Sequence, residues 1–337
     1  MLYNNNMKNI LMIGTGGTIS CEASSNGLAP AKLAEELLKY CPKVKTMCEV
    51  ECIQIFNIDS TNIRPEHWLM IKNVIQKNYD KYDGFVITHG TDTLAYTAAA
   101  LSYLVQNSEK PIVLTGAQLP ISELGTDAIK NVMDAFTVAI DDESHGVLVV
   151  FCGKVMLGTR TRKNFTKQFS AFISVNLPDL AKVQDGKIIR YIDLKHDKGV
   201  EFYDYLNPNV GILKFVPGMK KEVLQYLLDQ YDGLVIESFG VGGLPEYSDF
   251  YNQIKEATEK GKLIVMTTQV SNEGSDLSVY EVGVKVKKTI NILEAYDMST
   301  EAAFAKLMWV LSETNNFKDA EKLFYKKIAN DVLTYNV

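Results

Sequence analysis

Short apolar runs alternate with segments of helical periodicity along most of this chain, and the alternation occurs in two successive blocks. The apolar runs are typical of buried parallel strands, and segments with helical spacing follow them. Strands that alternate with helices favour a parallel sheet with right-handed crossovers. The sequence therefore predicts an α/β protein of two doubly wound α/β domains, a larger N-terminal parallel-sheet domain and a smaller C-terminal Rossmann-like domain.

The order of the expected elements divides the chain. In the first block we expect strands at 8–13, 50–56, 85–88, 111–115 and 146–151, and helices at 31–40, 65–79, 94–105 and 127–140. In the second block we expect strands at 210–213, 233–237 and 263–267, and helices at 219–228, 248–259 and from 300 onward. The charged stretch between the blocks lacks a clean period. We therefore expect an N-terminal domain over 1–185, a linker over 186–208 and a C-terminal domain over 209–337.

Composition limits the classes of partner. The 337 residues, 46% hydrophobic, suffice for proper cores. The net charge of −6 argues against a nucleic-acid surface, which needs clustered lysine and arginine. The most basic stretch, Arg160-Thr161-Arg162-Lys163, is too short for a binding face and is interpreted as a solvated loop. Lone lysines are nearly always solvated, and the sequence alone has no reason to bury Lys163.

Cysteines and the termini indicate the compartment. The five cysteines are odd in number and form no C-x-x-C, which favours reduced thiols in the cytoplasm. The four histidines are widely scattered, so no metal site is expected. The N-terminus lacks the pattern of a signal peptide, and no apolar run approaches the ~20 residues of a membrane span. We expect a soluble, cytoplasmic protein that binds neither nucleic acid nor membrane.

Two threonine-rich turns follow predicted strands. They are Thr15-Gly16-Gly17-Thr18 and Thr88-His89-Gly90-Thr91-Asp92-Thr93. In an open α/β sheet, the turns after strand C-termini gather at one edge and form the ligand crevice. We therefore expect the two turns to face each other across a pocket. A hydroxyl there becomes a nucleophile only with a base and an oxyanion site around it.

Each turn also has a purely structural interpretation. The glycines of the first permit positive φ, and the motif lacks the third glycine of a dinucleotide site, so a nucleotide site is disfavoured. In the second turn we expect Thr91 or Asp92 to cap the following helix. For His89 we favour a strand-end histidine bonded to backbone over a catalytic base.

Two further polar turns strengthen the case for a pocket. Asn57-Ile58-Asp59-Ser60-Thr61-Asn62 either caps the helix that starts near Pro65 or holds a small polar ligand. Thr115-Gly116-Ala117-Gln118 is the fourth such turn. Four polar strand-end turns in one half of a chain favour a pocket far more than any one of them.

At 15–19 and 88–93 the sequence resembles the two signatures of the bacterial-type L-asparaginases, the asparaginase/glutaminase family. Other segments similar to this family occur in its order over nearly the whole chain: Asp59-Ser60, Thr115-Gly116-Ala117-Gln118, Arg160-Thr161-Arg162-Lys163, Ser170-Ala171-Phe172 and Gly240-Val241-Gly242-Gly243. Without a signal peptide, the chain is most similar to the cytoplasmic type I branch.

The resemblance implies an L-asparagine amidohydrolase that needs no metal or organic cofactor. Thr18 would be the nucleophile that forms a β-aspartyl ester. Thr91, Asp92 and Lys163 would form a second hydroxyl–acid–amine set, in which Thr91 positions or activates the attacking water. The implied substrate-binding residues are Gly17, Asp59, Ser60, Thr61, Gly90 and Ala117.

The resemblance also implies how the substrate is held and how the chain assembles. Asp59 and Ser60 would hold the α-amino and α-carboxylate groups, while backbone N–H groups near Thr91 and Ala117 would polarise the amide oxygen. The family fold is two α/β domains in a homotetramer built from close dimers, so we expect a homodimer or homotetramer. The site would lie next to the partner's C-terminal domain, and the loop at 20–30, which we expect to be mobile, would close over the substrate.

The chain departs from the family at three points. Many members have a lid tyrosine over the nucleophile, whereas the segment 25–30 has none and Leu28 takes its place. Some type I members have an arginine that helps to form an effector site for asparagine, where this chain has Glu237-Ser238-Phe239-Gly240; we expect no such activation. Members that also use glutamine often have polar residues at the turn that the partner supplies, where this chain has Gly243 and Leu244. We therefore expect asparagine rather than glutamine as substrate.

Two other functions stay open from the sequence. One is the transfer-RNA-dependent amidotransferase subunit that shares the family fold, which needs an appended N-terminal domain and a partner; only about seven residues precede the first strand here. The other is a non-catalytic amino-acid-binding or sensing module, which would keep the Asp59 and Ser60 contacts. Such a module would not need Thr18, Thr91, Asp92 and Lys163 together.

Overall fold

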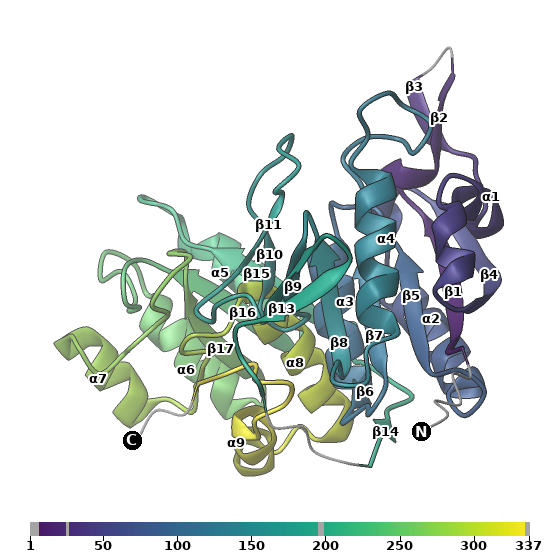
Figure 1. Cartoon of the computed structure of the whole chain (residues 1–337). Helices are drawn as coiled ribbons and strands as arrows, with labels where there is room; N and C mark the ends of the chain where they lie inside the picture. The colour runs from purple at the N-terminus through teal and green to yellow at the C-terminus, as the bar shows by residue number, and fades with distance from the viewer. Residues whose placement is uncertain (1–6, 25–26, 195–198, 334–337) are drawn as a thin grey trace. The chain divides into compact units, whose positions relative to one another are not determined.

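The computed structural model describes residues 7–24, 27–194 and 199–333, which form two compact units that divide between Tyr203 and Asp204. Each unit is built on its own sheet, so both are α/β (Figure 1). No helix in these ranges is long and apolar enough to cross a membrane.

The first unit contains an eight-stranded sheet in the order β13-β12-β9-β8-β7-β5-β1-β4. Its strands are β1 Asn9–Gly16, β4 Glu49–Ile58, β5 Gly84–Thr88, β7 Pro111–Thr115, β8 Gly146–Phe151, β9 Lys154–Leu157, β12 Ala181–Gln184 and β13 Lys187–Arg190. The five strands from β4 to β8 are parallel, as the alternation predicts, whereas β9, β12 and β13 are added antiparallel. The sheet is therefore mixed rather than purely parallel.

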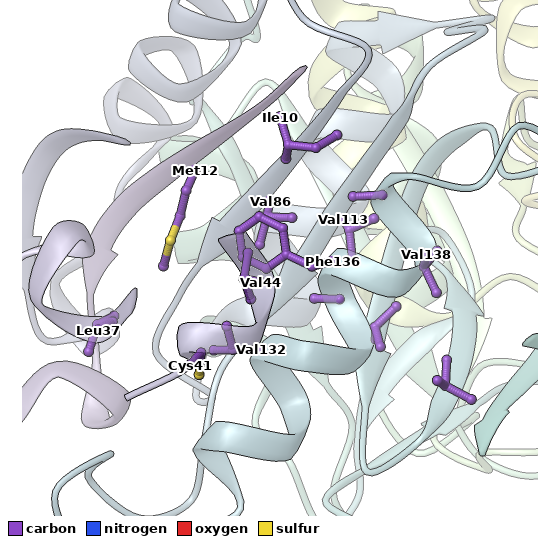
Figure 2. Packing of buried hydrophobic residues seen from close by; sticks show 14 of the residues in the cluster. Ile10, Met12, Leu37, Cys41, Val44, Val86, Val113, Val132, Phe136 and Val138 are labelled. Carbon is purple, nitrogen blue, oxygen red and sulfur yellow. The ribbon is translucent and has the colours of Figure 1, made fainter. Parts of the chain in front are cut away.

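Helices cover this sheet on both faces. They are α1 Ala34–Lys39, α2 Pro65–Asn78, α3 Leu94–Leu104 and α4 Ala128–Ala139. Successive side chains along each strand point to opposite faces of the sheet, and both faces are buried. Ile10 and Met12 thus share one face and belong to the core beneath α1 and α4. Figure 2 shows Val132 and Phe136 of α4 packed over this face, against the apolar side chains of the strands. Burial on both faces explains why the sequences of these strands are continuous apolar runs.

Two segments differ from the sequence-based expectation. The loop expected at 20–30 contains an antiparallel hairpin, β2 Cys21–Ser24 with β3 Gly27–Pro30, and the tip residues 25 and 26 lie outside the described ranges. The basic stretch at 160–163 is not a solvated loop. Arg160 and Thr161 are fully buried, and β10 Thr161–Lys163 pairs with β11 Phe172–Ser174.

The expected linker at 186–208 contains regular structure. β13 lies within it, and β14 Glu201–Phe202 pairs with β6 Val105–Gln106. Both strands pair with elements of the first unit, and the two units divide between Tyr203 and Asp204. The charged composition hid the strand pattern of β13 in the sequence. Charged residues are accommodated there because β13 is an edge strand with an exposed face.

The second unit has a parallel sheet of four strands in the order β15-β16-β17-β18. Its elements are β15 Val210–Lys214, α5 Lys221–Gln230, β16 Gly233–Ser238, α6 Phe250–Glu259, β17 Leu263–Thr268, α7 Glu281–Thr289, β18 Leu293–Glu294, α8 Thr300–Glu313 and α9 Phe317–Tyr325. Residues of α5 and α6 form one core with the strands, and α8 packs against β15, β16 and β17. The alternation in the second block thus predicts this unit well.

Candidate active site

The two threonine turns lie side by side at one edge of the first sheet. They follow β1 and β5, which are neighbouring parallel strands with Gly14 opposite Thr88. The Thr15 hydroxyl donates to the carbonyl oxygen of Thr88 at 2.8 Å. Farther along, the backbones touch, because a Cβ on Gly17 would lie 2.3 Å from the Cα of Gly90. Only glycine permits this approach, and the φ of Gly17, 79°, is also in the region that favours glycine.

A lysine, a threonine and an aspartate form a hydrogen-bonded cluster at this edge. The Nζ of Lys163 donates to Thr91 Oγ1 at 2.8 Å and to Asp92 Oδ1 at 2.6 Å. Lys163 ends β10, more than 70 residues after the other two. Its side chain is 17% exposed, whereas that of Asp92 is 57% exposed. The fold thus brings together three of the four side chains that the resemblance implies as catalytic.

The expectation that Thr91 or Asp92 caps the following helix is wrong. The N-cap of α3 is Thr93, which makes no side-chain capping bond. Its hydroxyl donates instead to the carbonyl oxygen of Ser60 at 2.8 Å. The side chains of Thr91 and Asp92 instead bond Lys163, which the chain supplies from a distant strand.

Thr18 opens a short 3-10 helix, Thr18–Ser20, just beyond Gly17. Ser20 holds this turn, because its backbone N–H donates to the carbonyl oxygen of Gly17 at 3.0 Å and its hydroxyl donates to the same oxygen at 2.8 Å. Thr18 is half-buried, and within the described ranges its hydroxyl has no hydrogen-bond partner. Leu28 of the hairpin is 54% exposed. The Thr18 hydroxyl is therefore unconstrained by hydrogen bonding to the described residues.

The third polar turn packs against the second. A Cβ on Gly90 would lie 2.5 Å from Ser60 Oγ, and Ser60 is buried. Asp59 is exposed, and its Oδ1 accepts from the backbone N–H of Thr61 at 2.8 Å and from the Thr61 hydroxyl at 2.9 Å. Asp59 thereby caps the short helix Ser60–Asn62 rather than α2, which begins at Pro65.

The fourth turn completes the edge beside Thr91. Ala117 is fully buried, and a Cβ on Gly116 would lie 2.3 Å from the carbonyl oxygen of His89. Asp127 secures the turn by accepting from the backbone N–H groups of Gln118 and Leu119. Neither Asp127 nor the side chain of Gln118, which accepts from the Thr91 hydroxyl at 3.2 Å, was expected as a site residue from the sequence. Two signals were available: Gln118 belongs to the fourth polar turn, and Asp127 starts a predicted helix.

His89 is a buried structural histidine, as the sequence favoured. Its Nδ1 contacts the carbonyl oxygen of Gly90 at 2.8 Å, so this nitrogen carries the proton. Its Nε2 lies 3.0 Å from the Thr97 hydroxyl, which itself accepts from the Trp68 indole at 2.9 Å. Complete burial lowers the pKa of His89 to about 4, so the ring is neutral near pH 7.

Among the described residues, no three histidine, cysteine, aspartate or glutamate side chains are grouped as a metal ion would require. The edge instead gathers threonine hydroxyls, the amine of Lys163, carboxylates and several backbone N–H groups. Such a set contains the parts of a hydroxyl nucleophile, a proton acceptor and an oxyanion site.

Comparison with known proteins follows the division into two units. A family model described as "Asparaginase, N-terminal" matches residues 9–195, and a "Glutaminase/Asparaginase C-terminal domain" model matches residues 209–324. The chain is 38% identical to the L-asparaginase of Thermococcus kodakarensis, over 96% of this chain and 98% of the relative. The solved structure of that thermostable enzyme superposes with a TM-score of 0.92 at 37% identity and covers 97% of this chain and 100% of its own.

Two other relatives differ in how much of their own length the match covers. L-asparaginase 1 of Escherichia coli K12 is 31% identical, and the match covers 96% of this chain and 98% of that protein. A glutamyl-tRNA(Gln) amidotransferase subunit of Pyrococcus furiosus is 37% identical, but the match, over 97% of this chain, covers only 77% of that protein. The asparaginases are therefore similar to this chain over nearly their full length.

Proposed function

Because the chain belongs to the asparaginase family and resembles its type I members, we propose that it hydrolyses L-asparagine to L-aspartate and ammonia through a threonyl acyl-enzyme. The observation that carries this proposal is the contact of Lys163 with Thr91 and Asp92, beside the turn that holds Thr18. An amine that contacts both a hydroxyl and a carboxylate can accept a proton and keep its charge balanced.

In the first half-reaction the Thr18 hydroxyl oxygen attacks the side-chain amide carbon of asparagine. The C–N bond then breaks, and the proton from the hydroxyl leaves with the amine as ammonia. The product on the protein is a β-aspartyl ester of Thr18. Backbone N–H groups near Thr91 and Ala117 stabilise the negative oxygen of the tetrahedral state, where one aligned donor is typically worth about 3 kcal/mol.

In the second half-reaction a water positioned by Thr91 attacks the ester. Its proton passes through the Thr91 hydroxyl to Lys163, and Asp92 stabilises the resulting ammonium. The ester C–O bond breaks, the Thr18 oxygen recovers its proton from the Lys163 ammonium, and L-aspartate is released. None of these steps needs a metal or an organic cofactor.

Substrate binding is assigned to the polar turns. Asp59 takes the α-amino group and Ser60 the α-carboxylate, while Gly17, Thr61, Gly90 and Ala117 line the same position. The exposed carboxylate of Asp59 uses one oxygen for Thr61, which leaves the other for an ammonium group. The hairpin of β2 and β3 acts as the lid. Gly243 and Leu244 favour asparagine over glutamine.

The remaining parts of the proposal concern assembly and compartment. The protein forms a homodimer or homotetramer in the cytoplasm, with each site completed by the partner's C-terminal domain. Size-exclusion chromatography with light scattering tests the assembly. A monomer that is fully active at assay concentration would contradict it.

Activity measurements on threonine and lysine variants test the acyl-enzyme mechanism. We expect the wild type to release ammonia from asparagine. We expect Thr18→Ala to abolish release, and Lys163→Met to lower kcat by about 10² to 10⁴, the range for a lost proton-transfer group. Lys167→Met, at an exposed lysine in the adjoining loop, is the matched control and should keep full activity.

The same experiment separates the other functions. An active Thr18→Ala variant would refute the assignment of the nucleophile. A wild type that binds asparagine without releasing ammonia would indicate a sensing module, and one that requires charged transfer RNA would indicate an amidotransferase subunit.

A further inference from the structure

The side chain of Gln118 joins two parts of the candidate site that are distant in sequence. Its Oε1 accepts from the Thr91 hydroxyl at 3.2 Å. Its Nε2 donates to the backbone oxygens of Thr166 at 3.0 Å and Gln168 at 3.1 Å. These two residues lie in the loop between β10 and β11, directly after Lys163 (Figure 1). One amide therefore contacts both the hydroxyl that Lys163 bonds and the loop that follows Lys163.

The orientation of this amide follows from the chemistry of its partners. Backbone oxygens only accept, so the NH₂ group of Gln118 must face Thr166 and Gln168. The oxygen of the amide must then face Thr91, which has to donate its single proton. The Thr91 oxygen is thereby left to accept from the Nζ of Lys163 at 2.8 Å. A flipped amide would lose both hydrogen bonds to the loop, because its oxygen would then face two backbone oxygens.

The backbone of Gln118 is also held in place. Both oxygens of the Asp127 carboxylate accept from its N–H at 3.0 Å, and Asp127 is 8% exposed. Asp127 further accepts from the side chain of Asn131 at 3.1 Å, on the first turns of α4. Gln118 is thus anchored to a rigid helix terminus, while its amide reaches the loop.

We propose that Gln118 is a positioning residue: by accepting the Thr91 proton it keeps the Thr91 oxygen facing Lys163, and by bonding the β10–β11 loop it holds Lys163 in place. The assignment rests on the proposed hydrolysis of asparagine and adds a residue to it. Gln118 does not touch the reacting atoms in this assignment. Its amide keeps the Thr91 oxygen next to Lys163, the amine that later receives the proton from water.

Gln118→Leu removes both functions of the amide at nearly constant volume. We expect kcat for asparagine to fall by up to about a hundredfold, the cost of a small misplacement of reacting groups. The KM should change by less than about threefold, because the substrate contacts are elsewhere. Gln184→Leu on β12, where the glutamine is exposed, is the matched control and should leave both constants unchanged.

Gln118→Glu separates the two functions and keeps the test valid if the leucine variant fails to fold. Its carboxylate still accepts from Thr91 but cannot donate to the loop. It would lie within about 6 Å of Lys163, close enough to favour the protonated amine. Asp92 is the charged group that contacts this amine. We expect the rising limb of the kcat/KM–pH profile to move to higher pH, with a lower kcat at every pH.

The outcomes distinguish this proposal from the proposed function. If the wild type releases no ammonia, the proposed function fails and the role of Gln118 fails with it. If the wild type is active and folded Gln118→Leu or Gln118→Glu keeps its kcat and pH profile, the positioning role alone is refuted. A loss of activity with an unchanged pH profile in Gln118→Glu would also refute it, because that result indicates a structural role only.

Discussion

His89 shows how burial decides the chemistry of one residue beside the candidate site. A histidine next to a candidate catalytic threonine could act as a base, yet both nitrogens of His89 are bonded within the fold. Burial lowers its pKa to about 4 from an ordinary value of 6.5. Protonation would place an uncompensated charge between α3 and the turn. His89 therefore supports the Thr91 turn in its neutral form and takes no part in proton transfer.

This shift predicts how stability depends on pH. As pH falls below 6.5 the unfolded imidazole binds a proton, while the folded one stays neutral until pH 4. The contribution of His89 is thus complete above pH 6.5, decreases as pH falls toward 4, and totals about 3 kcal/mol. Urea unfolding at intervals between pH 7 and pH 4 measures it. We expect His89→Gln to flatten the slope; an equal slope in both proteins would contradict the assignment.

At the scale of elements, the close approach of two turns depends on glycine. Gly17 and Gly125 have nearly the same φ, 79° and 78°, but a Cβ on Gly17 would meet the Gly90 backbone, whereas one on Gly125 would meet nothing within 4 Å. We expect Gly125→Ala to cost only about 1–2 kcal/mol of backbone strain and to stay active. Gly17→Ala should also separate the turns and abolish ammonia release. If Gly17→Ala and Gly125→Ala lost equal stability and equal activity, backbone strain alone would explain both effects, and the contact between the turns would not matter.

A second element-scale feature is a buried ion pair in the C-terminal unit. Lys306 of α8 bonds Asp331 at 2.6 Å and the carbonyl oxygen of Lys326 at 2.7 Å, and both charged side chains are fully buried. Asp331 also accepts from the N–H of Ile328 at 3.1 Å. The pair thereby attaches the segment after α9 to α8.

Removing one side chain of this ion pair should lower the free energy of unfolding strongly, because the charge of the other stays buried without its partner. We expect Lys306→Met to lower the free energy of unfolding by about 3–5 kcal/mol, and Lys306→Met with Asp331→Asn to lose clearly less. Lys322→Met on α9 breaks an exposed pair with Asp319 and should cost no more than about 1 kcal/mol. Urea unfolding compares the three variants. A double variant as unstable as Lys306→Met would refute the explanation by unpaired charge.

At the scale of the whole molecule, we predict that the rate of asparagine hydrolysis shows simple saturation with asparagine concentration. The reason is Glu237, in the segment where some family members have the arginine of an effector site. It lies near the end of β16 as a buried carboxylate that accepts from the Thr300 hydroxyl at 2.7 Å. A negative charge at this position repels the carboxylate of an amino-acid effector. We therefore expect a hyperbolic rate curve, with a Hill coefficient of about one, at several protein concentrations. A sigmoidal curve would contradict this prediction.

Much of the whole fold could be predicted from the sequence. Strands β7 and β8 and helix α2 lie within a residue of their expected bounds, because each is a short apolar or amphipathic run bordered by proline, glycine or a polar turn. The antiparallel strands β9 and β12 could not be predicted from such local patterns. They are brief and carry lysines, and their pairing depends on partners far away in the chain.

For the candidate site, the polar turns and their order along the strands could be predicted from the sequence, since the residues of each turn are contiguous. Tertiary structure decided the contacts between them. The sequence alone predicts that Lys163 is solvated, whereas strand β10 places it in contact with Thr91 and Asp92. The sequence alone assigns no contact to the Gln118 side chain, whereas in the fold its amide bonds the loop after Lys163. Local patterns specify where strands end. Only the packed sheet sets which distant side chains come within hydrogen-bonding distance, because that depends on strand order and register.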